Sequence, residues 1–474
     1  MANGKSYFFV GIGGSGMMPL AMILAGRGEV VAGSDRTLDA GHLPRKFDDL
    51  RAKGAALFPQ DGSGVNSADQ IVVASAAVEP TVADIVAAER VGATRMTRAE
   101  LLASLFNASD MPIGVAGTSG KSTVTGMIGW IFHALGRDPT VMNGAVMKNF
   151  VGDETPYSSA LVGDGPAFVS EVDESDGSIA GYQPKIAVLN NVSLDHKSLD
   201  ELRSLFGAFI AKADIAVVNI DNADGAALAK ALPPARVLRF SIGGSADIVA
   251  TNLAPQPFGV DFDVTENGQT EHVSLQVPGT HNVSNALAAI GAARAAGIAL
   301  DDAARAIGGF VGLRRRMELV GEAAGVIVID DFGHNPDKIG ATLDTLHAFP
   351  GRLLLLFQPH GYGPLKVMRR ELVAALAERM TPDDQLVLPD PVYQGGTVIR
   401  EVTSADIVAD LVALGARALH IADREDAAAY LAAEARSGDR IVVMGARDDT
   451  LSQLAADLLG AVADKAGKRA PTAI

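Results

Sequence analysis

The sequence IGVAGTSGKST, residues 113–123, joins a short apolar run to a glycine-rich loop. The run Ile113 to Ala116 predicts a buried strand, and the apolar positions from Val124 to Leu135 recur with a helical period. A strand, a glycine loop ending in Gly-Lys-Ser and a helix, in that order, are typical of a phosphate-binding loop. The stretch therefore predicts an α/β domain in which the loop binds phosphate at the N-terminus of a helix.

The loop contains the candidate nucleotide-binding residues Gly117, Thr118, Ser119, Gly120, Lys121, Ser122 and Thr123. Lys121 is expected to place its charge on the terminal phosphates, and the Ser122 hydroxyl is expected to bind Mg²⁺. The usual pattern is incomplete, because Val115 stands where its first glycine is expected. The competing interpretation is a glycine-rich turn with an exposed lysine.

Polar side chains follow two later strands of the same segment. Glu171 comes directly after the apolar stretch Ala167 to Val169, and His196 closes the segment that follows the predicted strand Ile186 to Asn190. Ligands bind at the carboxyl ends of strands in open α/β sheets, so Glu171 and His196 are expected to join Ser122 at a metal and phosphate site. Oxygen ligands suit Mg²⁺, whereas imidazole is a less usual ligand. A solvated acidic turn and a structural histidine are the alternatives.

A second glycine loop lies near the N-terminus, after the apolar run Tyr7 to Val10. GIGGSGM, which begins at Gly11, fits the pattern G-x-G-x-x-G, and Asp35 lies at roughly the spacing of a ribose-binding carboxylate. Such a loop alone is as often a nucleotide-diphosphate site or a tight turn as a nicotinamide site. Two phosphate loops suggest one nucleotide-linked substrate and one nucleoside triphosphate. A nicotinamide-dependent oxidoreductase is an alternative that leaves the Lys121 loop unexplained.

Strands and helices alternate along 474 residues, which are too many for one ordinary hydrophobic core. We expect three domains, covering residues 1–108, 109–312 and 313–474. The alternation predicts an α/β fold, with a doubly wound sheet in the first domain and a mostly parallel sheet in the second.

The composition disfavours several classes of partner and excludes several kinds of site. A formal net charge of -16 disfavours nucleic acid, because anionic ligands must then be bound by local groups. The absence of cysteine excludes a disulfide framework, thiolate metal sites and a cysteine nucleophile. The sequence shows neither a signal-peptide pattern nor an apolar stretch of membrane-spanning length, so we expect a cytoplasmic protein without a membrane partner.

Nine motifs, in order, resemble those of the Mur ligase family over nearly the whole chain. They are GIGGSGM with GSD, GTSGKST, EVDESDGS, NNVSLDH, PGTHNVSNALAA, GLRRRME, DDFGHNP, FQPH and PVYQGG. The resemblance implies an N-terminal Rossmann-like UDP-binding domain, a central P-loop-type ATPase domain and a C-terminal Rossmann-like α/β domain. It also implies an enzyme that uses ATP and Mg²⁺ to form an amide bond through an acyl phosphate.

Within that family, the motifs are most similar to those of the subgroup that joins L-alanine to UDP-N-acetylmuramate in peptidoglycan precursor synthesis. The implied partners are a UDP-linked sugar acid and an amine, either an amino acid or a peptide, bound by a monomer or homodimer. The main alternative is a different acceptor, such as a preformed peptide in cell-wall recycling or a substrate outside cell-wall synthesis. A non-catalytic nucleotide-binding subunit is a further alternative.

The resemblance also assigns individual residues. His281, Asn282 and Asn285 would lie near adenine. Arg316 and Asp331 would reach the phosphates and ribose on domain closure, and His334 would lie near the reacting centre unless it is a loop or cap residue. The implied catalytic residues are Lys121, Glu171, His196, Arg316 and His334. The implied substrate-binding residues are Gly11, Gly13, Gly14, Ser15, Gly16, Met17, Ser34, Asp35, Ser75, His360, Tyr362 and Lys366.

Several positions depart from the family motifs. Three that are expected to be tolerated are Ser119, Phe332 and Asn335. Gly361 and Pro364 stand where the resemblance implies arginines for the carboxylate of the incoming amino acid, and neither residue offers the bidentate fork of arginine. Lys366 remains nearby, and Arg447 is a candidate substitute cation.

Overall fold

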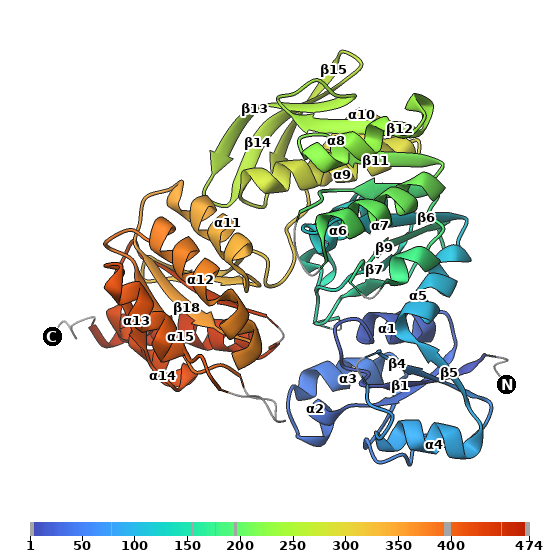
Figure 1. Ribbon diagram of the computed structural model, residues 1–474, viewed down its shortest axis with the longest axis horizontal. Helices are drawn as coiled ribbons and strands as arrows, with labels where there is room; N and C mark the ends of the chain where they lie inside the picture. The colour runs from blue at the N-terminus through green and yellow to red at the C-terminus, as the bar shows by residue number, and fades with distance from the viewer. Residues whose placement is uncertain are drawn as a thin grey trace. The chain divides into compact units, whose positions relative to one another are not determined.

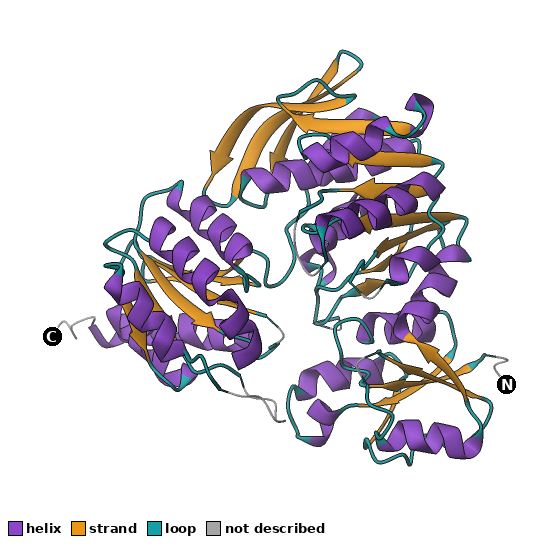
Figure 2. Cartoon of the chain, viewed as in Figure 1, coloured by secondary structure: helices purple, strands orange, loops and turns teal. Residues whose placement is uncertain are grey.

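The structure is a computed structural model that describes residues 4–76, 78–153, 155–175, 177–193, 197–392, 400–446 and 448–469. The chain divides into two compact units, Met1–Leu313 and Arg314–Ile474. The first unit contains a five-stranded sheet and a ten-stranded sheet, and the second contains a six-stranded sheet (Figure 1). Helices flank the sheets in both units (Figure 2). The expected α/β architecture, with one sheet for each of three domains, is confirmed.

The first sheet is entirely parallel, in the order β3-β2-β1-β4-β5. Its strands are β1 Ser6–Val10, β2 Val30–Ser34, β3 Ala56–Phe58, β4 Gln70–Ala74 and β5 Thr94–Thr97. Its helices are α1 Met18–Gly26, α2 Arg36–Asp39, α3 Pro44–Ala52, α4 Ala83–Val91 and α5 Arg98–Asn107. Because strand order reverses at β1, the glycine loop after β1 lies at a topological switch point, where such sheets bind ligands.

Helix α5 connects the first sheet to the second and is fixed at both ends. At its start, the Thr97 hydroxyl accepts from the Glu100 backbone N–H and the Glu100 carboxylate accepts from the Thr97 N–H, which forms a capping box. Near its end, the Phe106 ring packs edge-on against Phe168, in a strand of the second sheet, and against Tyr182, which follows a 3₁₀ turn of the same domain. The helix is therefore a rigid element between the two sheets.

The second sheet has the order β15-β14-β13-β12-β11-β10-β6-β9-β7-β8. Its strands are β6 Met111–Ala116, β7 Thr140–Met142, β8 Ala160–Leu161, β9 Ala167–Glu171, β10 Ile186–Leu189, β11 Ile215–Asn219, β12 Val237–Ile242, β13 Ile248–Gln256, β14 Gly259–Glu266 and β15 Gln269–Leu275. Its α-helices are α6 Lys121–Ala134, α7 Leu199–Lys212, α8 Ala223–Lys230, α9 Thr280–Ala295 and α10 Leu300–Ile307. Short 3₁₀ turns are η1 Lys148–Phe150, η2 Ser178–Gly181 and η3 Pro234–Arg236.

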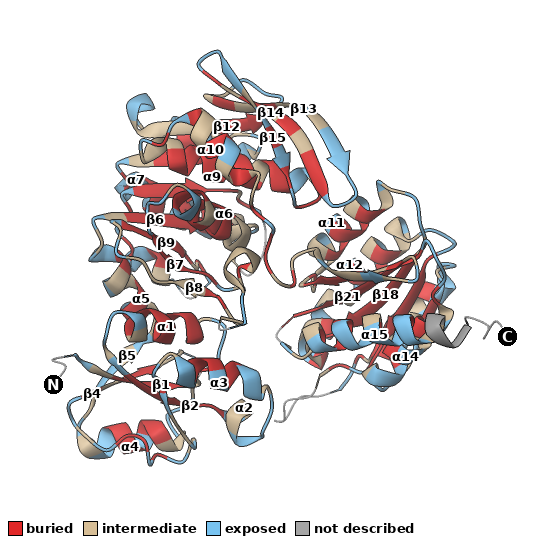
Figure 3. Ribbon diagram, turned by 180° about the vertical axis from the view of Figure 1, so that it is seen from behind, coloured by how far each residue is buried: buried red, intermediate tan, exposed pale blue. Residues whose placement is uncertain are grey.

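Strand β6 lies between β9 and β10 and runs parallel to both. The carboxyl ends of these three strands therefore meet at one edge of the sheet, which brings the glycine loop after β6 close to the polar segments that follow the other two. The strands themselves are buried on both faces (Figure 3). Burial on both faces explains why they read as continuous apolar runs in the sequence.

Three strands at one edge were not anticipated from the sequence. β13 pairs with β14 and β14 with β15, both antiparallel, which extends an otherwise mostly parallel sheet. The hairpin between β14 and β15 turns at Asn267 and Gly268, whose φ angles are +50° and +83°. An Asn-Gly pair between alternating strands is a strong hairpin signal, so this feature was present in the sequence.

The third sheet has the order β16-β17-β21-β18-β19-β20, with β16 the antiparallel strand. Its strands are β16 Glu318–Ala323, β17 Val326–Asp331, β18 Leu353–Gln358, β19 Gln385–Leu388, β20 Ala418–His420 and β21 Arg440–Gly445. Its helices are α11 Pro336–His347, α12 Tyr362–Arg379, α13 Ser404–Ala413, α14 Arg424–Glu434 and α15 Leu451–Arg469. The carboxyl ends of β17, β21 and β18 share one edge, which carries the DDFGHNP and FQPH motifs. None of the helices within the described ranges is both long and apolar enough to cross a bilayer.

Candidate functional site

The loop between β6 and α6 depends on glycine at two positions. Gly117 and Gly120 have φ angles of +135° and +84°, a region that favours glycine. Gly120 is also crowded, because a Cβ there would lie 2.5 Å from Asn190 Nδ2 and 2.6 Å from Asn285 Oδ1. The loop thus follows a tight path at the N-terminus of α6, where its backbone N–H groups can bind an anion.

The segment after β10 fixes this loop from one side. The Ser119 N–H donates to Asn191 Oδ1 at 2.9 Å, and the Thr118 hydroxyl donates to the Ser193 carbonyl at 3.0 Å. Thr123 lies in the first turn of α6 and is half-buried. The conformation of the loop is therefore set by the Asn191 side chain and the Ser193 backbone of NNVSLDH, the motif that was expected to lie beside it.

Hydrogen-bonded asparagine side chains connect the loop to helix α9. Asn190 Nδ2 donates to the Ser119 carbonyl at 3.0 Å and to Asn285 Oδ1 at 2.9 Å. Asn285 Nδ2 in turn donates to Asn282 Oδ1 at 2.9 Å. Asn282 and Asn285 are buried at the start of α9, whereas His281 beside them is exposed. The hydrogen bonds of Asn282 and Asn285 tie α9 to the loop, and the adenine contacts expected for all three residues stay a prediction.

Lys121 is paired within the loop region. Its Nζ donates to the Gly117 carbonyl at 2.8 Å and to Glu174 Oε2 at 2.8 Å. The lysine and glutamate side chains are 18% and 7% exposed, so the ion pair is largely shielded from solvent. A phosphate that binds Lys121 must therefore compete with Glu174, a residue of the EVDESDGS motif that the sequence did not single out.

Ser122 and Glu171 provide two adjacent oxygen donors. The Ser122 hydroxyl donates to Glu171 Oε2 at 3.0 Å, and the Gly144 N–H donates to Glu171 Oε1 at 2.5 Å. Neighbouring ligands of an octahedral Mg²⁺ at about 2.1 Å lie about 3 Å apart, so this hydroxyl and carboxylate fit the ion. His196, the third expected ligand, lies outside the described residues.

The first glycine loop is tied to the end of β2. The Gly13 N–H donates to Asp35 Oδ2 and the Thr37 N–H to Asp35 Oδ1, both at 2.8 Å. Both oxygens of this buried carboxylate thus bind backbone, which gives no support to the nicotinamide alternative. Ser34 is fully buried and donates to Asp84 Oδ2 at 2.5 Å, while burial raises the pKa of Asp84. Ser34 and Asp35 shape the loop in this structure.

A pocket of about 440 Å³ brings the two glycine loops together. Its wall includes the candidates Gly11, Gly14, Ser15, Gly16, Met17, Ser75, Lys121 and Glu171. These residues come from both sheets of the first unit, so the two phosphate loops open onto one cavity. The same pocket is also lined by Arg98 and Asp173, which the sequence reasoning missed. Asp173 belongs to an acidic motif that was noticed, whereas Arg98 stands in no recognisable motif and reaches the pocket only through the fold.

Asp173 carries a negative charge between two cations. Burial alone would raise the pKa of Asp173, but hydrogen bonds from Ser175 and the positive charges of Lys121 and Arg98 lower it. The backbone N–H of Ser175 donates to Asp173 Oδ1 at 2.9 Å. The pocket therefore combines cationic and anionic side chains, as a site for a metal-bound phosphate requires.

In the second unit, Arg315 is a buried arginine whose contacts are all structural. It is 7% exposed, and its guanidinium donates to the carbonyls of Gly445 at 2.7 Å and Asp448 at 2.8 Å. It also pairs with Asp330 at 3.4 Å. Burial raises the pKa of Asp330 to about 6 although Arg315 acts in the opposite direction. Of the GLRRRME arginines, Arg315 thus joins strand β17 to the end of β21 and to the loop that follows β21.

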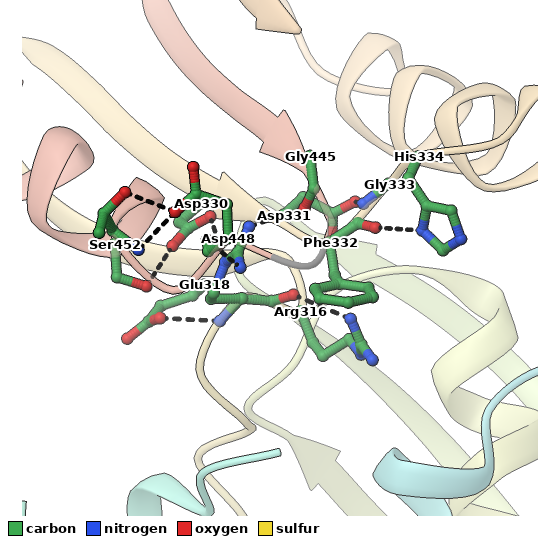
Figure 4. Close-up of polar contacts among 12 residues, drawn as sticks. Arg316, Glu318, Asp330, Asp331, Phe332, Gly333, His334, Gly445, Asp448 and Ser452 are labelled. Carbon is green, nitrogen blue, oxygen red and sulfur yellow. Dashed lines mark hydrogen bonds and ion pairs between the residues drawn. The ribbon is translucent and has the colours of Figure 1, made fainter. Parts of the chain in front are cut away.

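Arg316 stacks on the ring that replaces the tyrosine of the family motif. Its guanidinium carbon lies 4.2 Å from the centroid of the Phe332 ring, within the range of a cation–π contact. Figure 4 shows the two side chains together, with Asp331 next to Phe332 in the chain. Asp331 accepts from the Met317 N–H, the Gly333 N–H and the Thr342 hydroxyl at 2.8 to 2.9 Å. Asp331 therefore connects the GLRRRME and DDFGHNP motifs.

His334 is a neutral imidazole in an aromatic cluster. Its Nδ1 lies 2.9 Å from the Phe332 carbonyl, so Nδ1 carries the hydrogen and Nε2 is left as an acceptor. Its ring lies edge-on to His360, with centroids 5.5 Å apart. Burial, followed by the positive charge of Lys338, lowers the pKa of His334 to about 4. At neutral pH the residue is therefore uncharged, and its Nε2 can accept a hydrogen bond but is a weak base.

Further polar residues gather at the start of α12. The Arg400 guanidinium carbon lies 5.3 Å from the centroid of the Tyr362 ring, and Lys366 forms an ion pair with Glu401. Lys366 is thus engaged by a carboxylate of its own unit. Arg447, the other candidate cation, lies outside the described residues.

Comparison with known protein families divides the chain in the same order as its sheets. Residues 6–110 match the family described as "Mur ligase family, catalytic domain". Residues 115–293 match "Mur ligase middle domain", and residues 315–447 match "Mur ligase, glutamate ligase domain".

Individual relatives match over almost the whole chain. A UDP-N-acetylmuramate--L-alanine ligase from Streptomyces griseus is 34% identical over 455 residues, which cover 93% of this chain and 94% of the relative. The crystal structure of UDP-N-acetylmuramate-alanine ligase MurC from Thermotoga maritima superposes with a TM-score of 0.78 at 24% identity, covering 97% of this chain and 99% of that one. A murein peptide ligase from Psychrobacter arcticus superposes with a TM-score of 0.71 at 24% identity and the same coverage. Both structures therefore have the same fold as this chain.

Proposed function

The chain belongs to the Mur ligase family, and on that premise we propose that it joins L-alanine to the carboxyl group of UDP-N-acetylmuramate while ATP becomes ADP and phosphate. The relatives that are about one-third identical over nearly the full length carry this activity in their names. The observation that supports it most directly is the pocket shared by the two glycine loops, because a nucleotide-linked acid and ATP must meet for the reaction to begin.

In the first step, an oxygen of the donor carboxylate attacks the γ-phosphorus of ATP. A bond forms between that oxygen and phosphorus, the bond to the β-phosphate oxygen breaks, and ADP leaves. The attack joins two anions, so catalysis depends on positive charge and positioning. Lys121 lies at the start of α6 and is the residue proposed to bind the γ-phosphate, after exchanging its contact with Glu174 for the phosphate oxygens.

Ser122 and Glu171 are the residues proposed to hold Mg²⁺. When bound there, the ion would supply positive charge that offsets the charge of the phosphates. Ser122 and Glu171 supply a neutral and a charged oxygen 3.0 Å apart, and the Gly144 N–H fixes the orientation of the carboxylate. His196 is kept as a proposed third ligand.

In the second step, the amine nitrogen of the acceptor attacks the carbonyl carbon of the acyl phosphate. The tetrahedral intermediate collapses, an amide forms and phosphate leaves with the oxygen that came from the donor. The attacking amine must lose a proton to solvent, and His334 is proposed to orient the amine by accepting a hydrogen bond at its unprotonated Nε2. Arg316, stacked on Phe332, is proposed to neutralise phosphate charge.

The second candidate function keeps this chemistry but uses a short peptide as acceptor. It is favoured by one feature of the chain, namely that Gly361 and Pro364 offer no charged group for the carboxylate of a single amino acid. Lys366 is also paired with Glu401. A longer acceptor has its carboxylate further from the amine, so it does not need a cation at these positions.

An acceptor screen separates the two candidates. Purified protein, Mg-ATP and UDP-N-acetylmuramate are combined with single amino acids or with short peptides that begin with L-alanine, and phosphate release and product mass are measured together. We expect phosphate release that depends on L-alanine, with a product heavier by one alanine residue. Release only with peptides would support the second candidate, and donor-independent ATP hydrolysis with no product would contradict both.

We further propose that the reaction takes place in the cytoplasm.

A further inference from the structure

We propose that Arg98 binds the diphosphate of the UDP-linked donor and so determines the specificity of the first glycine loop for nucleotide-linked acids. The inference rests on the proposed function, since it assigns a residue to the donor of that reaction. Arg98 belongs to none of the sequence motifs, and it lines the pocket that the two glycine loops share.

Arg98 extends across the glycine loop at Gly16. A Cβ added to Gly16 would lie 2.9 Å from Cδ and 3.2 Å from Nη1 of Arg98. The guanidinium arm therefore occupies the space that a side chain at position 16 would need, and it lies against the loop backbone. This close approach gives a specific reason for glycine at position 16, beyond the general flexibility of the loop.

The helix that carries Arg98 fixes its position. Arg98 is the first residue of α5, directly after the Thr97 cap, and the capping box with Glu100 holds the first turn. The far end of α5 is packed into the core through Phe106. A guanidinium on a rigid helix loses little conformational entropy when it binds a ligand, and its planar fork matches two phosphate oxygens.

The electrostatics of the pocket require a local cation at this point. The whole chain has a net charge of -16, and Glu171 and Asp173 add negative charge to the pocket wall. A nucleotide diphosphate brings further negative charge into that surrounding. Arg98 and Lys121 are the lining residues that can offset it, and Lys121 is assigned to ATP in the proposed reaction.

The position of Arg98 favours the diphosphate over the carboxylate of the same donor. The diphosphate is expected at the glycine loop at the N-terminus of α1, where backbone N–H groups bind phosphate. Arg98 contacts this loop at Gly16. The carboxylate must instead reach the γ-phosphate at Lys121. UDP, which has the diphosphate but no sugar acid, therefore tests the assignment directly.

The variant Arg98→Met keeps most of the aliphatic arm over Gly16 but removes the charge, and Arg98→Lys keeps a charge without the fork. The matched control is Arg95→Met, because Arg95 lies three residues earlier and forms an exposed ion pair with Glu89 at 2.9 Å. Binding of UDP, of UDP-N-acetylmuramate and of a non-hydrolysable ATP analogue is measured by calorimetry. Thermal unfolding shows whether each variant is folded.

For Arg98→Met, we expect the Kd of both UDP and UDP-N-acetylmuramate to rise about 10- to 100-fold, as for the loss of hydrogen bonds to a charged group. Arg98→Lys should fall between that variant and the wild type, and the Kd of the ATP analogue should not change. Unchanged UDP affinity in Arg98→Met would overturn the proposal, and so would weaker binding of UDP-N-acetylmuramate alone, which would move Arg98 to the carboxylate. If the wild type binds neither UDP compound, the proposed function itself fails.

Discussion

Lys121 Nζ lies 2.8 Å from Glu174 Oε2, and the glutamate is 93% buried in the wall beside the phosphate loop. The lysine that the sequence assigns to ATP is thus paired with a buried carboxylate. The carboxylate of Glu174 gives the shielded lysine a counter-ion. A phosphate that binds Lys121 must therefore replace this carboxylate.

Glu174→Gln is expected to raise the affinity for ATP. Glutamine keeps the shape and an acceptor oxygen for Lys121 but removes a negative charge close to the triphosphate. We expect the Kd of a non-hydrolysable ATP analogue to fall about 3- to 10-fold, a modest Coulomb effect at a partly shielded site. Calorimetry with the analogue measures it, with Glu89→Gln as the exposed control. A higher Kd in Glu174→Gln would show that this carboxylate assists ATP binding.

Gly120→Ala is expected to abolish nucleotide binding and to destabilise the first unit. The added Cβ would meet Asn190 Nδ2 and Asn285 Oδ1 at 2.5 and 2.6 Å, in addition to the strain of a φ of +84°. Gly136→Ala is the matched control just past the other end of α6, because its φ is +67° but nothing lies within 4 Å of the new Cβ. We expect Gly120→Ala to lose about 1 to 3 kcal/mol more stability than Gly136→Ala in denaturant unfolding. Equal losses would mean that the asparagine pair does not constrain the loop.

Phe332→Leu is expected to lower turnover by releasing Arg316. The cation–π contact is worth about 0.5 to 2 kcal/mol, so the predicted fall in kcat/KM for ATP is about 2- to 30-fold. Phe332→Tyr keeps an aromatic face and restores the residue of the family motif, so it should retain wild-type turnover. Steady-state kinetics of both variants measure the effect. The stacking has no role in the reaction if the leucine variant equals the tyrosine variant.

His334→Gln is expected to change how stability depends on pH. The pKa of His334 is lowered to about 4 by burial and by nearby positive charge, while its ordinary value is 6.5. As pH falls from 7 to 5, the unfolded chain takes up a proton at this position and the folded chain does not. The wild type should therefore lose about 2 kcal/mol of stability relative to His334→Gln over that interval. Denaturant unfolding at several pH values tests this, and a constant difference between the two proteins would contradict the lowered pKa.

Much of the fold was predictable because its strands are locally recognisable. Ile113 to Ala116 was expected as a strand and is the greater part of β6, and β10, Ile186–Leu189, lies within the expected strand Ile186 to Asn190. Both are buried on two faces, so they read as continuous apolar runs whatever their neighbours are. The helix after the loop begins at Lys121 rather than Val124, because its first turn is polar and has no apolar period.

The candidate site was less predictable, because burial and pairing depend on residues far apart in the sequence. The motif residues Lys121, Ser122 and Glu171 are brought together as expected. Arg98 could not be recognised from the sequence as a pocket residue, since it lines the pocket only when α5 packs between the two sheets. The residues next to Asp35 do not indicate that both oxygens of its carboxylate accept hydrogen bonds from backbone N–H groups. One of the two donors lies 22 residues earlier in the chain.

The most direct test of an acyl-phosphate ligase follows the oxygen of the donor carboxylate. UDP-N-acetylmuramate labelled with ¹⁸O in that carboxylate is incubated with the protein, Mg-ATP and L-alanine, and the released phosphate and the amide product are analysed by mass. We predict one ¹⁸O atom in each phosphate released and one retained in the amide. Amide formation with unlabelled phosphate, or phosphate release without an alanine-containing product, would contradict it.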